Sequence, residues 1–323
     1  MRLRHIASAV LALFLATALC AESSLQKGDL VVMQGGGWWD SNLLIGGGEA
    51  LVLDANGAIR QQRSVFADRL VQALAAAKPD RVWFTQGEWI VYLSEDGETV
   101  ASTQKVLRGF ITHIITMRSG DLLAVDASRP PRIVRFNAGG VVSEHTLPYE
   151  LWVSGVVDLE LFPDQCTVAW IAAFPNDPSL GITRLQKRTV HAFNLCTNRA
   201  LADVLVVPDG IGEPRAFRLL ANGDYLVALE NEVVRFDPSG RQVAAWPFRA
   251  RHLAFTPDGN AFWIAALNAK TGGDSLVRAE LAKPGLGTIV VEKLPQWRSV
   301  SGLWVVGEWR AALQGSRRRS AGK

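Results

Sequence analysis

The chain has 323 residues, of which 48% are hydrophobic and 20% charged, and its formal net charge is +3. This apolar content can fill a large core, which excludes general intrinsic disorder. The positive net charge comes from the two ends, because Arg2 and Arg4 lie at the N-terminal end and Arg317–Arg319 and Lys323 at the C-terminal end. The part between them is slightly acidic, so we expect no nucleic-acid partner.

Residues 1–21 predict a cleaved export signal. A basic start precedes the uncharged apolar run Ile6–Leu19, and small residues follow it. This run is too short to span a bilayer comfortably, and we expect no transmembrane helix later in the chain. A periplasmic or secreted protein follows from this pattern. Lipid attachment at Cys20 is the alternative, although the preceding leucine is bulkier than the residue such signals usually carry there.

Two stretches of the chain resemble each other, Ser119–Gly140 and Asn222–Gly240. Each contains two apolar strands bounded by turns rich in Gly, Asp and Asn. One kind of turn recurs at residues 27–29, 78–80, 119–121, 163–165, 222–224 and 257–259. A second kind recurs at residues 54–57, 95–97, 137–140, 196–198, 237–240 and 283–285. The spacing within each kind is roughly 35 to 60 residues, which is the range of a propeller blade.

These repeats predict an all-β fold, a β-propeller of six four-stranded blades over residues 22–313, with seven blades as the alternative. One such sheet would expose two apolar faces, whereas a radial arrangement buries both. The N-terminal unit lacks an inner strand, which residues 299–306 would supply, and residues 309–313 look like a further strand. Phe66–Ala77 lies where the second unit needs an inner strand; it is expected to be a short helix or irregular segment, with a strand as the alternative. Residues 314–323 are expected to form a basic disordered tail.

Two cysteines remain after cleavage of the signal, Cys166 and Cys196. The first begins the second strand of the fourth unit and the other ends its third strand. Because these strands are antiparallel, the two residues are expected to face each other within reach of a disulfide. Export would make such a bond chemically possible. Two buried thiols are the alternative.

No nucleophile elbow, paired-cysteine zinc pattern or His-Glu-x-x-His motif occurs in the chain. The glycine-rich stretch Gly35–Gly48 lacks the Lys-Ser/Thr ending of a phosphate loop. We expect it to be a mobile loop that displays Trp38, Trp39 and Asp40 to a ligand or partner. Packing of both rings on the propeller face is the alternative.

Alignment of the inner strands on their turns places His113, Asp158 and His252 in one layer around a central channel. Imidazole and carboxylate groups can bind a divalent metal or transfer protons, so these residues are the predicted metal site. Arg215 and Arg251 lie near this layer in sequence and are predicted to bind a ligand. A water-filled polar channel is the alternative.

The segments Leu220–Ala228 and Phe255–Ile264 resemble NHL-type and gluconolactonase/regucalcin-like propeller repeats. The resemblance implies a six-bladed propeller, but its motifs are turns and strands, which specify a fold and not a chemistry. Gluconolactonase-like propellers hold a metal with Glu, Asn and Asp, a set we cannot place in this chain. The local His/Glu/His group of streptogramin-lyase-like propellers has no counterpart here either.

The sequence therefore favours a binding scaffold over an enzyme. We expect a monomer that holds a protein or small molecule on one propeller face through loops at Gly35–Glu49, Pro175–Thr183 and Asn268–Asp274, since loops on rigid scaffolds commonly carry function. The alternative is a metal-dependent lactonase or other hydrolase that uses the central channel and a divalent metal as its cofactor.

Overall fold

The computed structural model describes residues 25–40, 43–65, 71–78, 81–86, 89–93, 99–101, 111–126, 131–137, 140–147, 155–173, 189–268, 273–294, 300–310 and 314. Within these ranges every regular element is a β-strand, so the predicted all-β fold is confirmed. None of the described residues forms a helix that could span a membrane.

The strands form five four-stranded sheets and one five-stranded sheet. From the ring axis outward, the sheets contain β25 (Val300–Val305), β1 (Leu30–Asp40), β2 (Leu43–Leu53) and β3 (Ile59–Val65); β4 (Val71–Lys78), β5 (Arg81–Gln86), β6 (Trp89–Leu93) and β7 (Thr99–Ala101); β8 (Ile111–Thr116), β9 (Leu122–Asp126), β10 (Arg132–Asn137) and β11 (Gly140–Thr146); β12 (Gly155–Leu161), β13 (Thr167–Ala173), β14 (Thr189–Asn194), β15 (Arg199–Ala200) and β16 (Leu205–Val206); β17 (Ala216–Leu219), β18 (Tyr225–Ala228), β19 (Val233–Phe236) and β20 (Gln242–Trp246); and β21 (Ala250–Phe255), β22 (Ala261–Asn268), β23 (Gly273–Glu280) and β24 (Gly287–Val291).

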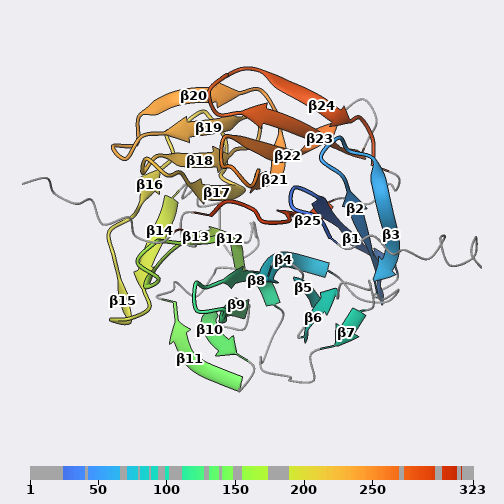
Figure 1. The fold of residues 1–323 in the computed structure, drawn as a ribbon. Helices are drawn as coiled ribbons and strands as arrows, with labels where there is room; N and C mark the ends of the chain where they lie inside the picture. The colour runs from blue at the N-terminus through green and yellow to red at the C-terminus, as the bar shows by residue number, and fades with distance from the viewer. Residues whose placement is uncertain are drawn as a thin grey trace, which may run out of the picture.

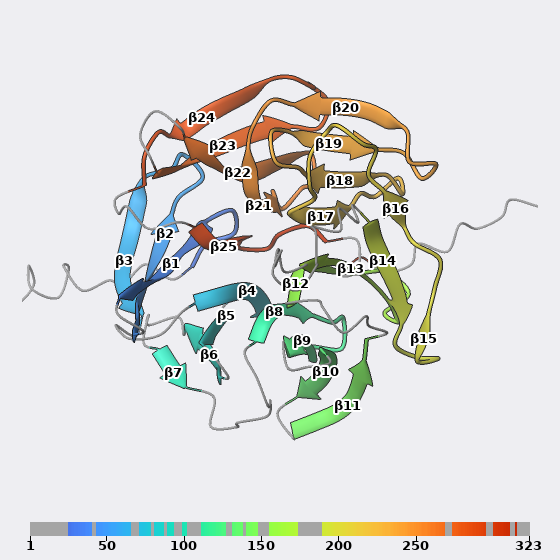
Figure 2. The ribbon, with the colours of Figure 1, turned by 180° about the vertical axis from the view of Figure 1, so that it is seen from behind.

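The sheets stand radially around one axis, which makes the fold a β-propeller (Figures 1 and 2). Their innermost strands contact one another in a closed cycle, in the order β4, β8, β12, β17, β21, β25 and back to β4. The cycle is closed by the two ends of the chain, because β25 pairs antiparallel with β1 in the register Leu30↔Val305. The inner strand missing from the N-terminal unit is thus supplied by the C-terminal end, as its sequence predicts.

The prediction that every blade has four strands is correct for five sheets only, because one sheet contains five strands. The remaining sheet has a divided outer edge, because β15 and β16 both pair with β14. Between them, Leu201 N donates to Ala192 O (3.0 Å) and Val204 N donates to Val190 O (2.8 Å), so the chain leaves the edge of β14 and returns to it. The described strands form no seventh sheet.

Burial decreases from the inner to the outer strands. All five residues of β9 and all four of β17 are buried, whereas most residues of the outer strands β11 and β24 are half-buried or exposed. Apolar clusters lie between adjacent sheets. In one of them Trp246 of β20 packs edge-to-face on Phe262 of β22, with their ring centroids 5.1 Å apart. Each sheet therefore buries both faces only because it has neighbours.

The predicted turns have the backbone that their residues favour. Gly120, Gly223 and Gly259 have φ of 87°, 90° and 70°, in the left-handed region that glycine adopts without strain. Gln165 takes φ of 61° at the equivalent position, which confirms its alignment with these glycines.

The repeat also includes an ion pair between the third strand and the turn that precedes the second strand. Arg135 Nε donates to Asp121 Oδ2 at 2.7 Å, and Arg235 Nε donates to Asp224 Oδ2 at 2.6 Å. The two similar stretches in the sequence thus share a side-chain contact as well as their turns.

Two local predictions are wrong. A short helix or irregular segment is the favoured prediction for Phe66–Ala77, but residues 71–78 form β4, which pairs with β5, so the alternative of a strand is correct there. Residues 66–70 lie outside the described part. The stretch Gly35–Gly48 was expected to be a mobile loop, but it belongs to the long hairpin of β1 and β2, in which Gly35 pairs with Gly48. In both segments pairing with a neighbouring strand outweighs local propensity.

The predicted disulfide is confirmed. Cys166 and Cys196 are bonded, and their Cα atoms are 5.3 Å apart. The register of β13 and β14 pairs Thr167 with Asn194, and Leu195 N donates to Cys166 O at 2.8 Å. Cys196 is therefore one residue beyond the position directly opposite Cys166, still within bonding reach.

Candidate functional site

The three residues of the predicted metal site occupy equivalent places in their inner strands. In β8, β12 and β21 the pairing with the next strand shifts by one residue near the start of the strand. The shifts fall between Ile111 and His113, between Val156 and Asp158, and between Ala250 and His252. A bulge of this kind bends the strand and re-aims the next side chain. His113, Asp158 and His252 are thus each the first paired residue after a bulge.

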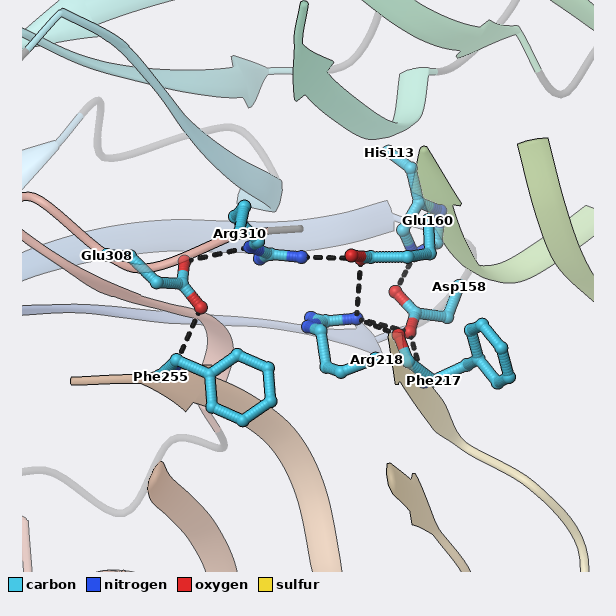
Figure 3. A network of polar contacts seen from close by, with 8 residues as sticks. All are labelled: His113, Asp158, Glu160, Phe217, Arg218, Phe255, Glu308 and Arg310. Atoms are coloured by element: carbon cyan, nitrogen blue, oxygen red, sulfur yellow. Dashed lines mark hydrogen bonds and ion pairs between the residues drawn. The ribbon is translucent and has the colours of Figure 1, made fainter. Parts of the chain in front are cut away.

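The two histidines make different contacts. His113 Nε2 lies 3.9 Å from Asp158 Oδ1, across the boundary between β8 and β12 (Figure 3). His252 Nε2 lies 3.1 Å from Val300 O, so it is this nitrogen that donates a proton to the carbonyl. Burial, assisted by the nearby Arg218 and His113 and opposed by Asp158, lowers the pKa of His252 to about 4. Its imidazole is therefore neutral at pH 7.

Asp158 connects two neighbouring sheets. Its Oδ2 accepts hydrogen bonds from Phe217 N at 2.6 Å and from Arg218 Nη1 at 2.7 Å, both in β17 (Figure 3). Arg218 Nη1 also donates to Phe217 O at 2.6 Å. One of the two carboxylate oxygens of Asp158 is thus occupied by two donors of the next inner strand.

A second set of charges, at the same level of the axis, was not included in the predicted site. Arg310 follows β25, and its Nη1 donates to Glu160 Oε2 at 2.6 Å (Figure 3). Its Nε lies 3.1 Å from Glu308 Oε2, and Glu308 Oε1 accepts from Phe255 N at 2.7 Å. Arg218 Nη1 lies 3.8 Å from Glu160 Oε2 and so joins the two sets. The network runs from β8 and β12 through β17 and β21 to the segment after β25.

Burial and neighbouring charges shift the pKa values of Glu160 and Arg310 in this network. Burial raises the pKa of Glu160, although Arg310 and Arg218 oppose that shift. Burial would also lower the pKa of Arg310, but Glu308 and Glu160 outweigh it, so that this pKa lies above its usual value. The guanidinium is therefore a permanent charge, and its attraction opposes the effect of burial on the pKa of Glu160.

The predicted ligand residue Arg251 is also paired. Its Nε lies 3.3 Å from Asp274 Oδ1, and Asp274 Oδ2 accepts from Val300 N at 2.6 Å. Burial raises the pKa of Asp274, while the Val300 amide and Arg251 oppose the shift. Asp274 thus connects its sheet to β25 as Asp158 connects its sheet to β17.

Arg215, the other predicted ligand residue, precedes β17 on the face where the inner strands begin. Its Nη2 lies 3.9 Å from Glu230 Oε1, and its side chain is 35% exposed. Trp38, Trp39 and Asp40 belong to the end of β1, where their backbones pair with β2, but their side chains lie outside the described part of the structure.

The arrangement differs from a ready metal site. Within the described ranges, no three His, Cys, Asp or Glu side chains come together as a metal ion requires. The acidic groups near the axis instead contact guanidinium groups and backbone amides of neighbouring strands. The sequence spacing brings His113 and Asp158 together, whereas Glu308 and Arg310 belong to no repeat and give no periodic signal. The only sequence hint for them is a pair of charges directly after the ring-closing strand.

No protein-family model matches the chain, and no curated protein matches it either. Solved structures do resemble it. A protein of unknown function from Bacteroides caccae has a TM-score of 0.56 at 16% identity, over 86% of this chain and 98% of its own. Virginiamycin B lyase from Staphylococcus aureus has a TM-score of 0.53 at 13% identity, over 87% and 96%. A gluconolactonase from Xanthomonas campestris has a TM-score of 0.51 at 16% identity, over 75% and 84%. At these identities the likeness shows the propeller fold alone.

Proposed function

We propose that the chain is an exported β-propeller that serves as a binding scaffold and holds a small molecule or a protein on the face where the inner strands begin. One observation carries the proposal. The acidic groups at the ring axis, such as Asp158, Glu160 and Asp274, each contact a cation or amide of another strand. These contacts join neighbouring sheets, so the axial charges support structure better than catalysis.

The binding face is proposed from its arginines. Arg215, Arg249 and Arg251 stand at the starts of β17 and β21, and their side chains are 35%, 45% and 36% exposed. Arginine is enriched in protein interfaces and binds oxyanions well because its donors form a planar fork. The side chains of Trp38 and Trp39 remain predicted contributors to the same function.

Export is part of the proposal. The signal predicted over residues 1–21 supports it, and so does the disulfide, because such bonds persist mainly in oxidising compartments. Fractionation of the source cells and the intact mass of the purified chain test it. We expect a periplasmic or secreted chain that begins at residue 22. A chain that keeps residues 1–21 in the cytosol would contradict export, and a lipid-sized mass increase at Cys20 would favour a lipoprotein.

Site-specific photo-crosslinking in those cells tests the binding face. A photoreactive residue replaces Asn231, which is exposed in the turn between β18 and β19, so that Arg215 and Arg249 stay in place. The control replaces Lys283, which lies in a turn between β23 and β24 with a 62% exposed side chain. We expect a discrete mass increase on the chain from position 231 and none from position 283. Equal adducts at both positions, or none at 231, would contradict the proposed face.

Metal analysis of the purified chain tests the proposal against a hydrolase. We expect no stoichiometric divalent ion. An ion that is present at one per chain and disappears in both His113→Ala and His252→Ala would contradict the scaffold proposal and favour a metal-dependent hydrolase.

A further inference from the structure

We infer that Arg215 and Arg249 form an oxyanion-binding site on the ring face, with the Glu230 carboxylate lying where the ligand's oxyanion would bind. The inference rests on the proposed function and names the chemical class of its ligand. Arg215 precedes β17, Arg249 precedes β21, and Glu230 lies in the connection between β18 and β19. The strands concerned belong to two adjacent sheets (Figure 1).

The two guanidinium groups converge on a single atom. Arg215 Nη2 lies 3.9 Å and Arg249 Nη2 lies 3.8 Å from Glu230 Oε1. Both separations exceed hydrogen-bonding distance, so the attraction is electrostatic and neither guanidinium fork is engaged by Glu230. An oxyanion about 2.8 Å from each group would gain the charge-assisted hydrogen bonds that Glu230 does not make.

This loose geometry is not a general feature of the surface arginines. Arg135 and Arg235 donate to their aspartates at 2.7 Å and 2.6 Å, although their side chains are 36% and 27% exposed. Arg278 gives a closer comparison, because its Nη1 lies 3.9 Å from Glu280 Oε1 at similar exposure. No second arginine is among the ion-pair partners of Glu280 in the described chain. The convergence of two guanidinium groups therefore distinguishes the Glu230 site.

Backbone contacts fix the main chain at all three residues. Arg215 N donates to Ala228 O at 2.7 Å, and Arg249 O accepts from Leu267 N at 2.9 Å. Glu230 lies in a tight turn that is closed by a bond from Leu229 N to Glu232 O of 2.7 Å. Gly212, with φ of 101°, packs so closely that an added Cβ would lie 3.0 Å from Glu230 Cβ. A site on fixed backbone loses little entropy when a ligand binds.

Charge and access favour an anion. Two guanidinium groups and one carboxylate leave a net charge of +1, and all three side chains are at least one-third exposed. A phosphate group and a carboxylate group both fit this chemistry, since each offers oxygens to paired guanidinium donors. The site would thus hold the acidic group of a larger ligand, while the rest of the propeller face contacts its remainder.

Titration calorimetry of the full mature chain at low ionic strength tests the site, with inorganic phosphate and citrate as separate probes. We expect saturable binding of at least one probe, and the tighter probe identifies the preferred oxyanion. Arg215→Ala and Arg249→Ala should each weaken binding about tenfold, the scale of one charge-assisted hydrogen bond. Glu230→Gln should strengthen it about threefold, because it removes a competing carboxylate.

Arg278→Ala is the matched control and should leave binding unchanged, since it removes the same charge from a pair with the same separation. The inference is overturned if neither probe binds, or if Arg215→Ala and Arg249→Ala bind as tightly as the unaltered chain. Glu230→Gln keeps the test valid if an arginine variant unfolds. Weaker anion binding by Glu230→Gln would also overturn the inference. Anion binding without a photo-crosslink at position 231 would contradict the scaffold proposal alone, and a crosslink without anion binding would contradict this site alone.

Discussion

Arg310 binds two carboxylates near the ring axis. Its guanidinium contacts Glu160 of β12 and Glu308 of its own segment, and Glu160 is almost completely buried. A buried ion pair adds little stability compared with apolar residues of the same shape, but removal of one partner leaves an uncompensated charge. The main role of Arg310 is therefore to compensate the charge of buried carboxylates rather than to add net attraction.

Arg310→Ala should lower the free energy of unfolding by about 3 kcal/mol at pH 7, as expected when a buried carboxylate loses its partner. Urea unfolding measures the change. Arg241→Ala is the control, because that side chain is 78% exposed and pairs with Asp237 four residues away. The control should change stability by less than about 0.5 kcal/mol. Equal effects of the two substitutions would contradict the role of Arg310.

The pH dependence of Arg310→Ala follows from Glu160. Burial raises the pKa of Glu160 in the folded chain, so the folded state binds its proton more tightly than the unfolded state. The stability associated with this group is present below the unfolded pKa and is lost as pH rises through the raised folded pKa. Loss of Arg310 raises that pKa further. The difference between variant and unaltered chain should therefore shrink as pH falls from 7 toward 4.5, the usual pKa of Glu.

His252 should affect stability in the opposite direction. Its pKa is about 4 in the folded chain against a usual 6.5, so the unfolded state binds more protons between these values. Stability should fall by up to about 3 kcal/mol as pH drops through this window, and His252→Gln should remove that part of the dependence. Histidine NMR titration provides the direct measurement. A His252 pKa near 6.5 would contradict the expectation.

The layer of His113, Asp158 and His252 could be predicted because each lies at a fixed distance from a repeated turn. The partners of Asp158 and Glu160 could not. Phe217 and Arg218 are about sixty residues from Asp158, and Arg310 is 150 residues from Glu160. No repeat connects those positions. Only the ring geometry brings them together. The sequence therefore suggests carboxylates that are available to a metal, whereas in the structure these carboxylates contact groups of the protein itself.

At the scale of single elements, the hairpin of β13 and β14 is the one with a covalent link. The Cys166–Cys196 bond closes a segment of 30 residues at the end of the hairpin where Asp164 also accepts from Cys166 N at 3.0 Å. A loop of this length restricts the unfolded chain appreciably. The same sheet has the divided outer edge formed by β15 and β16, so the bond stabilises the blade with the least regular edge.

The double substitution Cys166→Ser and Cys196→Ser should lower the free energy of unfolding by about 3 kcal/mol, because the unfolded chain regains the entropy of the open loop. Denaturant unfolding with and without reductant measures it. Reductant should destabilise the unaltered chain by the same amount and leave the double variant unchanged. A reductant effect on the double variant would show that another group is responsible.

Sequence reasoning failed for two elements in which local propensity and pairing disagree. The run from Leu74 to Ala77 has high helix propensity, yet it belongs to β4, because the ring requires an inner strand there. The glycines of β1 and β2 suggest a loop, yet they pair with one another, Gly36 with Gly47 and Gly37 with Gly46. Alternation and turn residues identified most other strands because those signals agree with the packing.

The complete ring depends on its last strand. β25 contributes Val300, Leu303 and Val305 to an apolar cluster that also contains Leu30 and Val32 of β1. Beyond it, Arg118 Nη2 donates to Gln314 O at 2.5 Å, which fixes the segment after β25 against the turn after β8. The closing strand and the segment that follows it therefore contact three parts of the ring.

A chain that ends at residue 299 should lose cooperative thermal unfolding, because β1 then lacks its inner partner and the cluster is exposed. A chain that ends at Gln314 is the control, since it keeps β25 and the contact with Arg118. Its melting temperature should stay within about 2 °C of the full chain, because residues 315–323 belong to the tail that the sequence predicts to be disordered. Circular dichroism and size-exclusion chromatography give the readouts. A cooperative, monomeric chain ending at residue 299 would contradict the importance of this closure.

The pairing of β25 with β1 also sets an order of events during biosynthesis. Ser301 Oγ donates to Met33 O at 3.3 Å across 268 residues, so β1 emerges long before the strand that completes its sheet. During that interval β1 keeps an open edge, and contacts between such distant segments form slowly. A second nascent copy offers the same β25 to that edge. Crowded synthesis should therefore produce dimers that exchange their last strand, and slower synthesis should favour closed monomers.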